Sequence, residues 1–161
     1  MYALPGLIDM HTHIGPVTSV PAEYLFKLWM GHGVTTIREV LAGNGIDWML
    51  EERGKSDRNE ITAPRIKSYV RFGMGAKSAI TTPQQAREWV DWLAGRGADG
   101  IKFFGTPPQI IAAALDEAKK KGLRSAAHLD QTGVARVNAL TAARRRRRAV
   151  SPPDHPRGDA H

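Results

Sequence analysis

The sequence predicts an α/β fold in which a parallel β-sheet of about five strands alternates with α-helices. Two observations predict it. Short segments rich in β-branched or aromatic residues recur along the 161-residue chain, and amphipathic segments of helical length separate them. Strand, helix and strand at this spacing are typical of right-handed βαβ units. These patterns are compatible with an open doubly wound sheet or with the first part of an eight-stranded barrel, which typically needs about 250 residues.

Five segments have the composition of short strands. The second of them, Val-Thr-Thr-Ile-Arg-Glu-Val, is typical because most of its residues are β-branched. In chain order the predicted strands are 2–9, Val34–Val40, Arg65–Val70, Gly100–Phe104 and Arg124–Leu129.

Helical patterns lie between and after these strands. They cover Pro21–His32, Ile46–Arg53, a segment that begins at Thr82 and Pro83, Pro107 or Pro108 to Lys121, and Thr132 to about Arg148. The first places Tyr24, Leu25, Leu28 and Trp29 on one face and has Gly33 just past its end. Thr82 and Pro83 suit the N-cap and the first helical position, and Trp89, Val90 and Leu93 form the apolar stripe that follows.

Composition narrows the function classes. The chain contains no cysteine, so disulfides and thiolate metal ligands are excluded, and any metal must be held by histidine, carboxylate or modified lysine. We identify no apolar segment long enough for a membrane span and no signal-peptide pattern, so we expect a cytoplasmic protein. Neither Gly-x-Gly-x-x-Gly after the first strand nor a P-loop occurs, which disfavours nucleotide-binding versions of the fold.

The net charge of +7 is concentrated near the C-terminus. Residues 144–161 hold six Arg and two Asp, so residues 1–143 carry only +3. We therefore predict two parts: a partial barrel over 1–143, and an Arg- and Pro-rich tail over 144–161 that is disordered or translated out of frame. The run Arg144–Arg148 supports an alternative function, binding of polyanions or nucleic acid, although no aromatic residues are interleaved with it.

The run Pro5-Gly6-Leu7-Ile8-Asp9-Met10-His11-Thr12-His13 carries the clearest functional signal. Alternate side chains of an extended backbone share a face, so His11 and His13 can point at one spot. Two neutral imidazoles that converge from the end of a strand favour a metal site. The alternative is that one histidine is a structural polar residue and the other lies in a turn.

This run resembles the first-strand signature of the amidohydrolase superfamily, the metal-dependent hydrolases built on a distorted TIM barrel. The resemblance covers roughly residues 3–143 and implies an incomplete TIM-type (β/α)8 barrel with about five βα units. It extends to the segment that begins at Gly33. Arg38 and Glu39 of this segment could reach the cleft, but we expect them to form structural pairs instead. His32, by contrast, we expect to be structural at a helix end.

Two further positions match the resemblance. Lys102 lies within an apolar strand, where an unpaired charge is expensive unless the side chain snorkels to solvent. The resemblance implies that Lys102 can be carboxylated by carbon dioxide and bridge two metals, and that His128, after the fifth strand, is a metal ligand. His11, His13, Lys102 and His128 are thus the implied ligands of one or two divalent ions, most simply zinc.

The activity implied is hydrolysis of an amide or cyclic amide bond in a small molecule by a metal-activated water. The family's sixth-strand histidine and eighth-strand aspartate ligands have no counterpart here, so no catalytic residue is assigned and we expect low activity. Because an open sheet leaves an unpaired edge strand, we also expect association into homo-oligomers.

Overall fold

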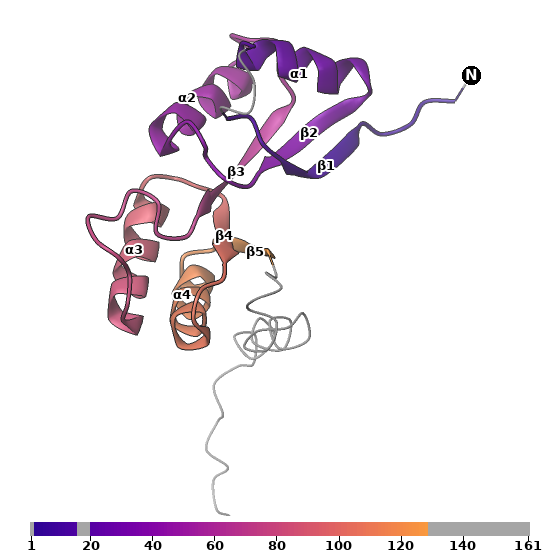
Figure 1. The fold of residues 1–161 in the computed structure, drawn as a ribbon. Helices are drawn as coiled ribbons and strands as arrows, with labels where there is room; N and C mark the ends of the chain where they lie inside the picture. The colour runs from indigo at the N-terminus through magenta and orange to yellow at the C-terminus, as the bar shows by residue number, and fades with distance from the viewer. Residues whose placement is uncertain (1, 16–19, 129–161) are drawn as a thin grey trace, which may run out of the picture.

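The computed structural model describes residues 2–15 and 20–128, and the tail at 144–161, the Arg144–Arg148 run and the predicted helix from Thr132 lie outside them. Five strands and four helices alternate along the described chain (Figure 1). They are β1 (Leu7–Thr12), α1 (Ala22–Gly31), β2 (Val34–Glu39), α2 (Ile46–Asp57), β3 (Arg65–Arg71), α3 (Pro83–Gly95), β4 (Gly100–Phe104), α4 (Pro108–Lys120) and β5 (Arg124–His128).

The strands form one parallel sheet in the order of the chain, β1-β2-β3-β4-β5. A doubly wound sheet reverses its strand order at a switch point, whereas the strands of a barrel follow one another in sequence. The unbroken order therefore selects the barrel interpretation over the open doubly wound sheet. The predicted α/β class is confirmed, and the described residues form a curved half-barrel.

β3 is shared unevenly between its two neighbours. Its first part pairs with β2, from Thr36↔Arg65 to Glu39↔Ser68, and its last part pairs with β4, from Tyr69↔Gly100 to Arg71↔Lys102. Figure 1 accordingly shows α1 and α2 with β1 and β2 in the upper part of the molecule, and α3 and α4 with β4 and β5 in the lower part.

The apolar core consists of two clusters of buried side chains, and Trp48 packs against both of them. The smaller cluster joins the segment after β1 with α1, β2 and β3 through Ile14, Phe26, Ile37 and Ile66. The larger cluster contains Met49 of α2, Val70 of β3, the inner faces of α3 and α4, and Ile101 and Phe103 of β4. Alternation along β4 therefore leaves Lys102 on the opposite face of the strand from Ile101 and Phe103.

Helix ends follow the sequence signals closely. Thr82 and Gln85 form a capping box at the start of α3, with Pro83 as the first helical residue. Gly33 follows the C-cap of α1 with φ +81, a conformation that side chains with a Cβ rarely adopt.

Three boundaries or faces differ from the prediction. The first strand begins at Leu7 rather than residue 2, because its pairing with β2 begins only at Leu7, beyond Pro5 and Gly6. α2 continues past Arg53 to Asp57, supported by the ion pair between Lys55 and Glu51. In α1 the fully buried residue is Phe26, while Tyr24 and Leu28 of the predicted stripe are exposed.

No helix in the described ranges has the length and apolar character needed to cross a bilayer.

Gly100 is a position where only glycine fits. A Cβ added there would lie 2.6 Å from the Arg124 carbonyl oxygen of β5 and 2.6 Å from the Tyr69 ring. We expect Gly100→Ala to lower the free energy of unfolding by about 1–3 kcal/mol, because the backbone of β5 must move away. Urea denaturation measures the change. Gly95→Ala in α3 is the control, since nothing lies within 4 Å of its added Cβ; an equal loss in both variants would contradict the steric argument.

Candidate metal centre

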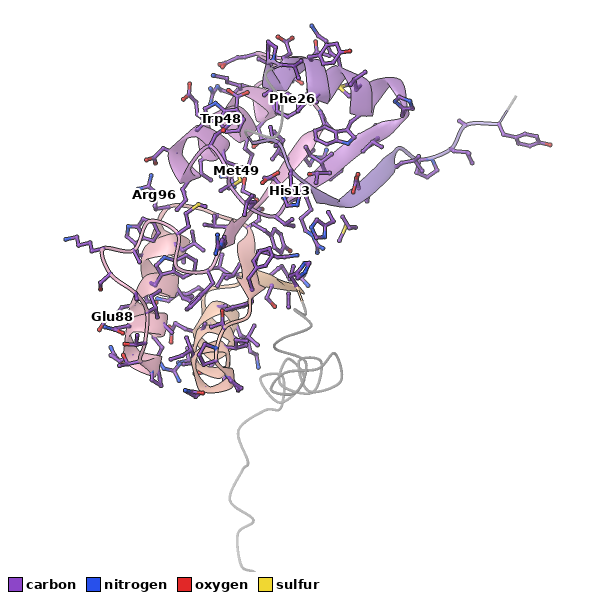
Figure 2. All side chains as sticks on the ribbon, in the orientation of Figure 1. His13, Phe26, Trp48, Met49, Glu88 and Arg96 are labelled. Carbon is purple, nitrogen blue, oxygen red and sulfur yellow. The ribbon has the colours of Figure 1, made fainter. Side chains whose placement is uncertain are left out.

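The predicted ligand residues gather at the carboxyl ends of the strands. His11 lies in β1 and His13 follows it directly, Lys102 lies in β4, and His128 is the last residue of β5. In Figure 2, His13 lies near the middle of the molecule, close to the end of β1. Because the strands are parallel, these ends share one edge of the sheet, which is where barrel enzymes carry their active sites.

His11 and His13 lie next to each other. Their ring centroids are 5.2 Å apart, with an angle of 73° between the ring planes. The pairing of β1 with β2 is irregular between Asp9 and Thr12, and such irregularities re-aim side chains. Thr12 lies between the two histidines in the sequence. Its side chain is buried, and its hydroxyl has no hydrogen-bond partner among the described residues. The two imidazoles therefore lie side by side at the end of β1, and their convergence on one ion stays a prediction.

Positive charge surrounds His11. Burial lowers the pKa of His11 below its usual 6.5, and the charges of Lys102, His13, Arg38 and His128 lower it further. A lowered pKa favours the neutral ring, which is the form that binds metal.

Lys102 is buried without an acidic partner. Its exposed fraction is 2%, and the described part of the chain offers it no ion pair with a carboxylate. Its Nζ atom lies 5.4 Å from the centre of the Phe104 ring. Burial lowers the pKa of Lys102 below 10.5, and the charge of Arg38 acts in the same direction. The side chain therefore lies inside the fold rather than snorkelling into solvent.

His128 does not join the histidine pair in one cluster. It stacks on Phe104, with 5.1 Å between ring centroids and an interplanar angle of 17°. No group of three His, Cys, Asp or Glu side chains within residues 2–15 and 20–128 is close enough to hold a single ion. Among the described residues, Lys102 is the further ligand that the resemblance implies for a cation at His11 and His13, a role for which its amine would become a carbamate anion.

Glu39, at the end of β2, holds the segment that follows the histidine pair. It is 1% exposed and accepts three backbone N–H groups: Ile14 at 2.7 Å on Oε2, and Leu41 and Ala42 at 2.9 Å on Oε1. Its carboxylate oxygens are thus occupied by backbone donors rather than by the guanidinium of Arg38. From the sequence we expected a structural pairing of Glu39 but did not predict that it accepts backbone N–H groups. The signal that could have indicated this role is an acid between Ile37 and Val40 in an apolar strand.

Arg38 is also held in place structurally. Its Nε donates to the Met10 carbonyl at 2.6 Å, and its guanidinium lies 5.0 Å from the centre of the Tyr69 ring. It lines a cavity of about 520 Å³ within the half-barrel, together with Ile8, Met10, Lys67 and Tyr69 among others.

The chain was compared with known proteins by sequence and by fold. No family model matches it. An adenine deaminase from Methanoculleus marisnigri is 40% identical over 62 residues, which span 34% of this chain and 12% of that protein. An adenine deaminase from Lysinibacillus sphaericus is 36% identical over 63 residues, or 35% of this chain and 11% of that protein. The matched region is thus about an eighth of the length of these relatives.

A solved structure shares the fold. The crystal structure of a proposed prolidase from Bifidobacterium longum superposes with a TM-score of 0.57 at 23% identity, covering 90% of this chain and 38% of that one. The chain therefore resembles the N-terminal part of the catalytic domain of amidohydrolase-type hydrolases, as the first-strand motif predicts.

Proposed function

We propose that this chain, which resembles the N-terminal part of amidohydrolase-superfamily enzymes, supplies the metal ligands of a hydrolase that cleaves a carbon–nitrogen bond in a small molecule. The observation that carries the proposal is the adjacent His11–His13 pair, together with a buried Lys102 that has no acidic partner among the described residues. The similarity to adenine deaminases and to the fold of a proposed prolidase supports the same class of reaction.

The protein residues have distinct roles in this proposal. His11 and His13 would bind one divalent cation through neutral imidazole nitrogens. The Lys102 amine would add to carbon dioxide and release a proton, and the resulting carbamate would offer two oxygens to neighbouring cations. His128, oriented by the Phe104 ring, would hold a second cation. Zinc is the simplest choice, because imidazole and carboxylate-type oxygens suit it and thiolates are absent from the chain.

A bound divalent ion lowers the pKa of its water toward neutrality and polarises the carbonyl or amidine carbon under attack. Among the described residues, the acids next to the histidines are engaged by backbone groups: Glu39 as given above, and Asp9 by the N–H of His11 at 3.0 Å. We therefore assign no proton-transferring residue, and turnover by this chain is expected to be slow.

Metal content tests the proposal directly. We expect the purified chain, equilibrated with zinc and bicarbonate and then desalted, to retain about one to two zinc ions per chain. Intact mass spectrometry should then show the mass of one added carbon dioxide. Lys102→Met, which keeps the length of the side chain, should lose that adduct and retain less zinc. Zinc content no higher than in a heat-unfolded sample would refute the proposed function.

A further inference from the structure

Cations gather at the strand ends that surround the candidate metal centre. Arg38 is the last residue but one of β2, and Arg71 is the last residue of β3, in register with Lys102 of β4. Neither arginine forms an ion pair with a carboxylate in residues 2–15 and 20–128. Elsewhere in the sheet and helices, Arg53, Lys67 and Arg87 each have such a partner.

This positive charge lies at the edge of the sheet that carries the predicted ligands, because Arg38 and Arg71 both stand at the carboxyl ends of their strands. Uncompensated positive charge in one region raises the local concentration of anions and favours their binding. A ligand that carries a negative group would compensate this charge, whereas a neutral ligand would not.

Arg71 is the cation best placed to contact a ligand. It is exposed, and its guanidinium lies 5.6 Å from the centre of the Phe104 ring, the same ring on which His128 stacks. The end of β3 is fixed at this point, because Phe72 N–H donates to the Lys102 carbonyl at 2.8 Å. An arginine held against an aromatic face keeps its planar set of N–H donors available for a carboxylate.

We propose that the substrate of this site carries a carboxylate, which Arg71 binds at the carboxyl end of β3 while the bond to be cleaved faces His11 and His13. That the bound molecule is a substrate rests on the proposed function. The binding of its carboxylate rests on Arg71 and its neighbours alone. It narrows the substrate class to anionic amides such as N-acyl amino acids and dipeptides.

A pair of ligands that differ in one group provides the test. N-benzoylglycine carries a carboxylate, and N-benzoylglycinamide carries a neutral amide in its place. Their affinities are measured by ligand-observed NMR on the full chain, first without zinc, so that the metal cannot bind the carboxylate, and then with zinc. We expect the acid to bind about tenfold more tightly than the amide, as a charge-assisted bidentate pair allows, and the preference to shrink as salt is added.

Two variants locate the effect. Arg71→Gln should remove the preference for the acid. Arg65→Gln is the matched control, because Arg65 lies on the same face of β3 at its opposite end and is also exposed. The Arg65→Gln variant should keep the preference of the unmodified chain for the acid over the amide. Equal affinities for acid and amide, no binding of either, or a preference that survives Arg71→Gln would each overturn the proposal.

The binding test of this inference and the zinc test of the proposed function can fail independently of each other. If zinc is retained but no preference for the acid exists, the hydrolase proposal stands and the carboxylate inference fails. If the preference depends on Arg71 and zinc is not retained, the anion site stands and the hydrolase proposal fails.

Discussion

Replacing His13 with alanine is expected to lower the zinc affinity of the chain by about 100-fold or more. Loss of a group that only orients a ligand typically weakens metal binding about 10–100-fold, so loss of a ligand itself should have at least the upper effect. His13 lies 5.2 Å from His11 between ring centroids, and the described residues offer no third His, Cys, Asp or Glu that could take its place. Competition with a chromophoric zinc chelator measures the affinity.

His32→Ala is the matched control for this prediction. His32 is exposed at the C-cap of α1, where its Nδ1 lies 2.7 Å from the Leu28 carbonyl oxygen. The substitution removes one imidazole from the chain without touching the candidate metal centre, and the zinc affinity should stay unchanged. If both variants lose affinity equally, zinc binds to the surface histidines without a defined site.

Glu39→Ala should have the largest effect on stability, a loss of about 3–5 kcal/mol in the free energy of unfolding. The substitution leaves the N–H groups of Ile14, Leu41 and Ala42 buried without their acceptor, and each charge-assisted hydrogen bond contributes about 1.5–3 kcal/mol. Such a loss is a large fraction of the total stability of about 5–15 kcal/mol typical of a domain. Urea denaturation followed by tryptophan fluorescence measures it.

An exposed acid provides the comparison. Glu23 forms an ion pair with Lys27 at 3.0 Å on the surface of α1, so Glu23→Ala should change the stability by less than about 1 kcal/mol. Comparable losses in the two variants would show that the backbone donors of Glu39 find other partners. Glu39→Gln, which keeps one acceptor oxygen, should fall between them.

The pH dependence of Glu39 adds a second readout. Burial raises the pKa of Glu39 above 4.5, although its backbone donors act in the opposite direction. The folded state therefore holds this proton more tightly than the unfolded state does. The stabilisation of the folded state by this tighter proton binding is fully present below about pH 4.5, and it is lost as the pH rises through the raised pKa of Glu39. Relative to Glu39→Gln, the unmodified chain should lose stability over that interval.

The sequence was a good guide where local patterns decide the structure. β-branched runs and caps placed β2 to β5 and the start of α3 within a few residues, because these signals act through the adjacent backbone. The histidine pair followed from the two-residue period of an extended strand. The apolar neighbours Ile101 and Phe103 placed Lys102 in a strand but left open whether its side chain is buried or reaches solvent, and the structure shows it buried.

Features that depend on distant partners were harder to predict. β1 begins at Leu7 because β2 pairs there, which the composition of residues 2–6 does not reveal. Phe26 is buried because it meets Ile37 and Ile66, and the helical period alone also favoured Tyr24 and Leu28. The role of Glu39 requires a backbone donor from Ile14, 25 positions away in the sequence, besides those of the nearby Leu41 and Ala42. Whether His128 reaches the histidine pair depends on the curvature of the whole sheet.

The uneven sharing of β3 bears on how the native chain opens. Because β2 and β4 pair with different parts of β3, and each side has its own apolar cluster, the two sides can lose hydrogen-exchange protection separately. The side with β1, α1 and β2 has the smaller cluster and should exchange first. His11 and His13 lie on that side and Lys102 on the other, so an ion held by all three would suppress this sub-global opening and make the two sides exchange as one unit.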